Sequence, residues 1–256
     1  MIKIIDKDFR KLNQFKEFCK LDSFGTRIYS HYLTYGIELN FADFWVQFCD
    51  DTITCAICRL DCDFVVCACE KSDFEELSAF LNFQNFATLT FDDNFSDIVN
   101  VEYKKSSKGD ILKYSGKCDK IYDYSFVTPD NKKYHDLLLS CESEDFFVPD
   151  YQSFLSDVVR RQTRGLCTVY GIEVEGVLVS CAMTVSYTDF SVILGAVATH
   201  PLHRKRGYAG FVVSTLANKF FDYGKVYIYT TIAKNTLFYK SLGFEICGSW
   251  RKLYGG

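Results

Sequence analysis

Two hydrophobic patterns alternate along the first part of the chain. In the segments 9–21 and 38–49, apolar residues recur at steps of three and four, which predicts two helices. The segments 51–60 and 63–70 are short apolar runs joined by a turn at Asp61 to Asp63, and they predict two strands. The chain therefore begins with helices and continues into a sheet.

A helix and a further strand follow, over 72–83 and 86–91. Ser72 or Asp73 supplies the N-cap of this helix, and acidic residues in its first turn complement the helix dipole. The segment 102–120 is polar and rich in Ser, Gly and Lys, which predicts a linker or an exposed hairpin. We expect a domain boundary near Lys120, with one domain over 1–120 and another over 121–256.

The second part of the chain alternates elements more regularly. Turn residues stand at Glu175 and Gly176 and again at Thr188 and Asp189. The pattern predicts strands over 122–129, 166–174, 177–187, 191–199 and 226–231, a terminal strand pair over 244–250 and 251–255, and helices over 134–141, 151–162, 208–224 and 236–243. This order predicts an α/β (α+β) domain with a largely antiparallel sheet and one central strand-turn-helix unit.

Charge and hydropathy narrow the class of protein. The chain has 256 residues and a formal net charge of −4, so its overall field repels nucleic acids and anionic membranes. Its apolar runs are shorter than a bilayer-spanning helix requires, and the first residues lack the apolar core of a signal peptide. We expect a cytoplasmic protein that binds neither nucleic acid nor membrane.

The 12 cysteines do not form a recognisable metal framework. Cys55 and Cys58 form a C-x-x-C, but on a strand they point to opposite faces and cannot both reach one ion. Cys62, Cys67 and Cys69 lie in an apolar run, where cysteine serves as a small hydrophobic residue. We expect no metal site.

A basic patch precedes the long helix of the second part. The sequence "VATHPLHRKRGYAG", 197–210, places Arg204, Lys205, Arg206 and Gly207 where that helix begins. The first amides of a helix lack internal acceptors and carry partial positive charge, so such a turn attracts phosphate. A basic but purely structural helix start and a nucleic-acid contact are the alternatives.

The same stretch resembles motif A of the GNAT superfamily of acyl-CoA-dependent N-acyltransferases. The signature Q/R-x-x-G-x-G/A is matched by Arg204, Gly207 and Ala209. Further on, "NTLFYKSLGFE", 235–245, resembles the superfamily's Asn…Tyr-x-x-x-Gly-Phe segment. The two motifs have the superfamily's order and spacing, and the resemblance covers residues 121–256.

The resemblance implies an acyl-CoA site. Backbone amides from Lys205 to Gly210 would hold the pyrophosphate, the edge of the strand at 197–199 would pair with the pantetheine arm, and the N–H of about Ala198 would face the thioester carbonyl. Small residues at the helix start would let it approach both ligand and sheet. The residues expected at this site are Val197, Ala198, Thr199, Arg204, Lys205, Arg206, Gly207, Tyr208, Ala209, Gly210, Asn235, Phe238 and Tyr239.

The resemblance also implies catalytic roles. Tyr239 would protonate the departing thiolate, as a phenol with a pKa near 10 can at neutral pH. The asparagine that many members carry seven residues before this tyrosine is Ile232 here, so Asn235 either caps the short helix or contacts the pantetheine arm. Ala198 would supply the oxyanion contact.

The sequence predicts no particular general base. The central strands contain no carboxylate, and Glu173, Glu175 and Asp189 fit solvated turns. Glu142, Glu144 and Asp145 lie where an acceptor amine would bind. Cys141 and Cys181 are conceivable acyl carriers without a histidine partner, so direct transfer is expected.

The first half is similar to a degenerate copy of the same fold, as in tandem GNAT proteins. Only Lys71 and Ser72 separate its strand from its helix, so it lacks a phosphate turn and is expected to bind no CoA. The expected function is acetyl-CoA-dependent N-acetyl transfer to a primary amine of a small molecule or peptide. A non-catalytic acyl-CoA-binding regulator is the alternative. We expect the chain to be a monomer or a homodimer.

Overall fold

The computed structural model describes residues 1–116, 122–143 and 146–255. Two compact units divide the chain: Met1–Ile111 with Cys247–Gly256, and Leu112–Ile246. The division falls inside strands β6 (Lys105–Tyr114) and β11 (Phe244–Tyr254). The expected boundary at Lys120 and the acidic residues Glu144 and Asp145 lie outside the described residues, and the domain division at 120 stays a prediction.

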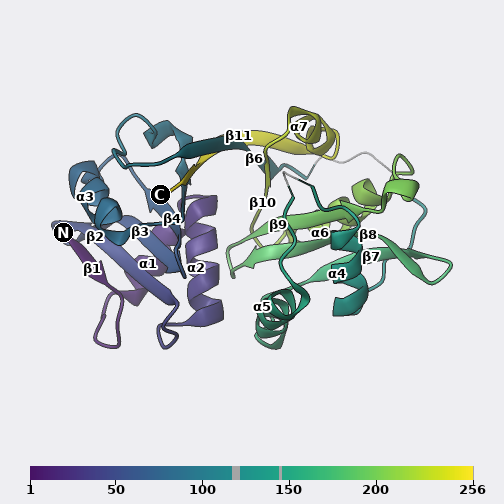
Figure 1. Cartoon of the computed structure of the whole chain (residues 1–256), viewed down its shortest axis with the longest axis horizontal. Coiled ribbons are helices and arrows are strands. Elements are labelled where there is room, and N and C mark those ends of the chain that lie inside the picture. Colours follow the sequence, from purple (N-terminus) through teal and green to yellow (C-terminus); the bar gives the residue numbers. More distant parts are fainter. Residues whose placement is uncertain (117–121, 144–145, 256) are drawn as a thin grey trace. The chain divides into compact units, whose positions relative to one another are not determined.

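The first unit is a sheet with helices on both faces (Figure 1). Its strands are ordered β1-β2-β3-β4-β5-β11, and β4 and β5 are parallel. Trp45 on β2 packs on Phe80 of α3, whereas its neighbour Phe44 packs on Tyr32 of α2 from the other face. The elements are β1 (Ile2–Ile4), α1 (Leu12–Cys19), α2 (Ser23–Tyr35), β2 (Ala42–Cys49), β3 (Thr52–Leu60), β4 (Asp63–Ala68), α3 (Phe74–Gln84) and β5 (Thr88–Asp92).

Two predictions for this part of the chain were wrong. The segment 38–49 holds strand β2 and not a helix: Phe41, Phe44, Trp45 and Phe48 imitate helical spacing because β2 is buried on both faces. The segment 102–120 is neither linker nor hairpin at its centre, since residues 105–114 form strand β6. The predicted strands β3, β4 and β5 and helices α1 and α3 are confirmed, whereas α2 was not predicted.

A glycine in α2 provides a test of the packing between α1 and α2. A Cβ built on Gly25 would lie 2.3 Å from the Cys19 carbonyl oxygen, a backbone atom that cannot move alone. We expect Gly25→Ala to lower the free energy of unfolding by about 2 kcal/mol, although alanine ordinarily favours a helix. Chemical denaturation measures it. Gly210→Ala, whose Cβ would meet only side-chain atoms of Tyr122 and Leu242, should cost less, and equal costs would contradict the packing.

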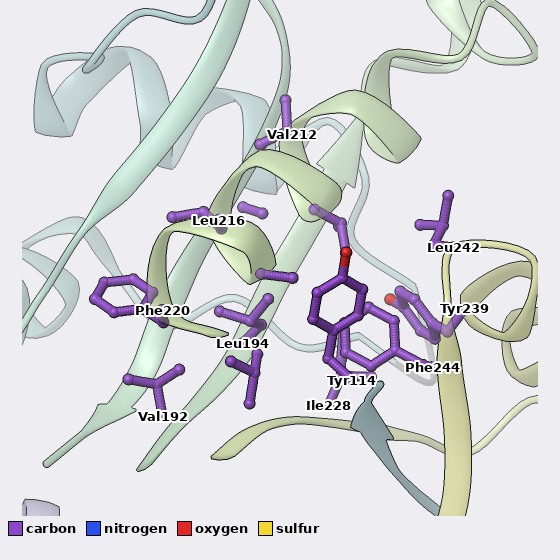
Figure 2. Close-up of a cluster of buried hydrophobic side chains, with 14 of the residues drawn as sticks. Tyr114, Val192, Leu194, Val212, Leu216, Phe220, Ile228, Tyr239, Leu242 and Phe244 are labelled. Carbon is purple, nitrogen blue, oxygen red and sulfur yellow. The ribbon is translucent and has the colours of Figure 1, made fainter. Parts of the chain in front are cut away.

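The second unit has the expected α/β class with a mostly antiparallel sheet. Its strands are ordered β6-β10-β9-β8-β7; β7, β8 and β9 pair in antiparallel directions, whereas β9 and β10 are parallel. Helices α4 and α5 pack on one face, and α6 packs on the other through Val212, Leu216 and Phe220 (Figure 2). The elements are α4 (Asn131–Leu139), α5 (Tyr151–Thr163), β7 (Val169–Val174), β8 (Val177–Tyr187), β9 (Ser191–Thr199), α6 (Tyr208–Phe221), β10 (Lys225–Thr230) and α7 (Ala233–Lys240).

Most predictions for the second unit are confirmed, with two corrections. The segment 122–129 is not a strand: only Val127 makes an isolated bridge, to Gly171. The end of the chain is one strand, β11, and not a strand pair, because Gly248 and its neighbours continue the extended backbone without a turn. No helix among the described residues is both long and apolar enough to cross a bilayer.

Strand β9 stops pairing with its neighbour β10 halfway along its length. Its parallel pairing with β10 runs from Ser191 to Leu194 and then stops. Immediately afterwards the ladder with β8 shifts register, and Ala196 takes a left-handed φ of 48°. A bulge of this kind bends a strand and re-aims its peptide groups. The segment 195–199 therefore opens away from β10.

The two units repeat one order of elements. The first runs α1-α2-β2-β3-β4-α3-β5, and the second runs α4-α5-β7-β8-β9-α6-β10. In each, a helix connects two parallel neighbouring strands, β4 to β5 and β9 to β10. In each, the parallel pairing covers only the first part of the earlier strand. The repeated order is what a tandem arrangement of one fold produces.

Candidate functional site

A cavity of about 340 Å³ lies at the N-terminus of α6 in the second unit. Its lining residues are Val197, Thr199, the stretch 203–210, Asn235, Phe238 and Tyr239. This set contains every residue expected at the acyl-CoA site except Ala198, and it adds His203. Residues from β9, the following loop, α6 and α7 thus meet in one place.

The start of α6 is open and positively charged. The first helical hydrogen bond runs from the Phe211 N–H to the Gly207 carbonyl, so the amides of Tyr208 to Gly210 have no helical acceptor. Gly207, at the N-cap, has a φ of 85° and no side chain to cap these amides. His203, Arg204, Lys205 and Arg206 lead into it, and Lys205 also has a left-handed φ of 63°. Such a turn favours an anionic ligand.

Contacts with the rest of the unit fix the loop before α6. The Tyr124 hydroxyl donates to the Arg206 carbonyl at 2.7 Å, and the Arg204 Nε donates to the Thr199 carbonyl at 3.2 Å. A Cβ on Gly210 would lie 2.3 Å from the Tyr122 hydroxyl. The missing side chain of Gly210 therefore makes room for Tyr122 and not for a close approach to the sheet. These contacts fix the conformation of the loop without a ligand.

Helix α3, the counterpart of α6 in the first unit, begins differently. The Asp73 carboxylate caps it by accepting from the Glu76 N–H at 2.9 Å, and Glu75 and Glu76 stand in its first turn. The Gln47 side chain accepts from the Asp73 N–H at 2.8 Å. These acceptors occupy the amides and repel anions, so the α3 terminus does not suit a phosphate ligand.

Tyr239 combines a cavity position with burial. The residue is 7% exposed and packs against Phe244 of the core (Figure 2). It also lines the cavity. Burial raises the pKa of Tyr239 to about 12, because desolvation disfavours the phenolate. The phenol therefore keeps its proton at neutral pH and can only be a donor to an anion.

Asn235 does not cap α7. The N-cap is Ile232, and Asn235 lies inside the first turn, where its N–H donates to the Ile232 carbonyl at 2.8 Å. This corrects the capping alternative for Asn235. Its side chain reaches the cavity, as does Phe238.

The amide of Ala198 faces β8 and not the cavity. Ala198 is paired with Cys181 of β8. Two positions further along β9, the His200 N–H donates to the Val179 carbonyl of β8. Because every second residue of an antiparallel strand directs its N–H to the same neighbouring strand, the Ala198 N–H also points toward β8. In an extended strand the adjacent amide points to the opposite edge, which makes Val197 the residue whose N–H is directed at the open edge of β9.

The other candidate residues have structural contacts. Cys181 is fully buried, which raises the pKa of its thiol and disfavours a nucleophilic thiolate. The Cys141 thiol donates to the Thr199 carbonyl at 3.4 Å. Glu173 pairs with Lys133 at 2.8 Å, and Glu142 accepts from the Val148 N–H. Within the described residues, no cluster of three His, Cys, Asp or Glu is arranged to hold a metal ion.

Two features of the site were not predicted. His203 lines the cavity, and its buried Nδ1 has no hydrogen-bond partner among the described residues. Its position directly before Arg204 is the one feature of the sequence that could have indicated its place in the site. The left-handed Ala196 in β9 carries no signal, since alanine has no preference for that conformation. The sequence therefore predicts the loop before α6 better than it predicts the conformation of strand β9.

Comparisons with known proteins agree with this geometry. Residues 131–244 match the acetyltransferase (GNAT) family. No curated protein matches. A GNAT acetyltransferase from Colwellia psychrerythraea is similar in structure with a TM-score of 0.59 at 12% identity, covering 100% of both chains.

Two further structures extend the likeness. A tandem GNAT protein from the clavulanic acid biosynthesis pathway has a TM-score of 0.62 at 11% identity, covering 100% of this chain and 98% of that one. A GCN5-related N-acetyltransferase from Kribbella flavida has a TM-score of 0.58 at 12% identity, covering 78% and 86%. The fold of the whole chain is thus that of tandem GNAT proteins, and residues 131–244 form a domain of the acetyltransferase (GNAT) family.

Proposed function

We propose that this chain is an acetyl-CoA-dependent N-acetyltransferase that acts on a primary amine of a small molecule or peptide. The observation that carries the proposal is the cavity at α6. It combines an uncapped helix start, four basic side chains, the open edge of β9 and a buried protonated Tyr239. Phosphate, an amide-bearing arm and a thiolate leaving group are the ligand features that such a site suits.

The loop and helix start hold the phosphates in this proposal. Amides from Lys205 to Gly210 face the pyrophosphate, and the side chains of Arg204, Lys205 and Arg206 neutralise the remaining phosphate charge. The polar edge of β9 at Val197 and Thr199 pairs with the amides of the pantetheine arm, beside Asn235 and Phe238. Acyl-CoA itself supplies the activated thioester.

The Val197 amide and Tyr239 act on the reacting atoms. The amine nitrogen attacks the thioester carbonyl carbon, and the Val197 N–H stabilises the negative charge that grows on the carbonyl oxygen. The C–S bond then breaks, and Tyr239 donates its proton to the leaving sulfur. Because the pKa of Tyr239 exceeds that of a thiol, the proton moves only after the C–S bond has broken, and the phenolate then takes a proton back from water.

Direct transfer needs no protein carboxylate as base. An amine can lose its proton to water before attack, and the attacking nitrogen releases its second proton to water once the amide bond forms. Burial excludes Cys181 as an acyl carrier, so no covalent acyl-enzyme is included. We propose that the first unit binds no CoA, because its helix start at α3 is occupied by Asp73 and Gln47.

A transfer assay tests this function. The full chain is incubated with acetyl-CoA and a library of primary amines, and thiol release is followed together with the mass of each amine. We expect release only in the presence of accepted amines, each gaining one acetyl group. Binding of acetyl-CoA without transfer to any amine would contradict the enzyme and support a non-catalytic acyl-CoA-binding regulator.

A further inference from the structure

The peptide group between Ala196 and Val197 is held from the face of the sheet opposite α6. The Tyr134 hydroxyl, on α4, donates to the Ala196 carbonyl at 3.4 Å. The Cys181 thiol, on β8, donates to the same carbonyl at 3.8 Å. Two donors therefore hold this oxygen toward α4, although a carbonyl within a regular strand lies in the plane of the sheet.

Tyr134 is suited to be a permanent donor. Its side chain is fully buried between β8, β9 and α5, where it packs against Phe154. Burial raises the pKa of Tyr134 well above its ordinary value, so its hydroxyl keeps the proton throughout the range of assay pH. Its hydrogen bond thus holds the bulge in β9 at every pH at which the protein is studied.

The direction of the carbonyl fixes the direction of the neighbouring amide. A trans peptide group is planar, with its C=O and N–H pointing in opposite directions. Because the Ala196 oxygen is held toward β8 and α4, the Val197 N–H points the opposite way, toward the open edge of β9 and the face that α6 covers, where Val197 lines the cavity. A hydrogen bond to the carbonyl also polarises the peptide and strengthens its N–H as a donor.

We propose that Tyr134 is a positioning residue, which holds the Val197 N–H in place for the carbonyl oxygen of a bound acyl thioester. The identity of that ligand rests on the proposed function. Tyr134 itself touches neither the cavity nor the reacting atoms, and it acts only through the peptide group. The left-handed conformation of Ala196, which is unfavourable for a residue with a Cβ, is stabilised by these two hydrogen bonds.

Replacing Tyr134 with phenylalanine separates catalysis from binding. We expect Tyr134→Phe to lower kcat about tenfold, less than the loss of an oxyanion donor costs, because the amide remains but is no longer held. KM for acetyl-CoA should stay within about twofold, since the phosphates contact α6. Tyr114→Phe is the matched control: it removes another buried hydroxyl, which donates to Asn218, and should lower stability while leaving kcat unchanged.

An infrared measurement reports the same hydrogen bond without turnover. The probe is acetyl-CoA labelled with ¹³C at the thioester carbonyl, whose stretching frequency falls as its hydrogen bond strengthens. We expect a lower frequency when it is bound to the wild type or to Tyr114→Phe than when it is bound to Tyr134→Phe.

The outcomes separate this inference from the proposed function. If the wild type binds acetyl-CoA but transfers to no amine, the function fails, and the frequency still decides the role of Tyr134. A wild-type kcat or, without turnover, a wild-type frequency in Tyr134→Phe overturns the inference. Should that variant not fold, Cys181→Ala removes the second donor and should raise the frequency; an unchanged value overturns it equally.

Discussion

Gly207→Glu abolishes the thermal stabilisation that acetyl-CoA gives to the wild-type protein. The substituted residue would have to adopt a φ of 85°, and its carboxylate would stand among the amides that face the pyrophosphate. At a concentration one hundred times Kd, a ligand stabilises by about 2.7 kcal/mol, which corresponds to roughly 5–10 °C in Tm for a protein of this size. Thermal unfolding with and without acetyl-CoA measures the difference.

The control for this variant is Gly176→Glu. Gly176 also has a left-handed φ, 80°, and space for a Cβ, but it lies in the turn between β7 and β8. It should lose a similar amount of intrinsic stability and keep the full shift with acetyl-CoA. A full shift in Gly207→Glu would refute the placement of the pyrophosphate at α6.

Tyr239→Phe is expected to lower kcat by about 100-fold, within the range that a lost general acid costs. The ring remains against Phe244, so affinity for acetyl-CoA should change little. Steady-state kinetics and titration calorimetry measure the two quantities. Tyr187→Phe, on the part of β8 that packs against Phe220, should leave both unchanged.

The pH dependence gives a second view of Tyr239. Its pKa is raised to about 12, so the protonated donor persists as pH increases and is lost only near that value. Titration of Tyr239 should therefore cause no fall in kcat between pH 7 and pH 10. An alkaline fall in that interval that disappears in Tyr239→Phe would contradict the raised pKa, and an unchanged kcat in this variant would exclude its catalytic role.

The cofactor-facing residues could be predicted from the sequence because they are local. The stretch 203–210 is continuous, and its charges, glycines and following helix are all visible in one short window. The second stretch, which carries Asn235, Phe238 and Tyr239, lies on one short helix. Motifs of this kind need no knowledge of long-range packing.

The errors arose where tertiary contacts override local pattern. Strand β2 has helical spacing because both of its faces are buried, and strand β6 begins with exposed polar residues that are typical of a loop. The hydrogen bond between Tyr134 and Ala196 joins residues 62 positions apart. Since neither residue has an unusual local sequence, the sequence does not predict the direction of the Val197 amide, and the motif alone points to Ala198.

A crystal structure of the full chain with acetyl-CoA tests the central claim, that the cavity at α6 binds and activates an acyl thioester. We predict the pyrophosphate within hydrogen-bond distance of the amides from Lys205 to Gly210. The thioester carbonyl should accept from the Val197 N–H, with its sulfur beside the Tyr239 hydroxyl. A cofactor bound at α3, or a thioester remote from Val197 and Tyr239, would contradict it.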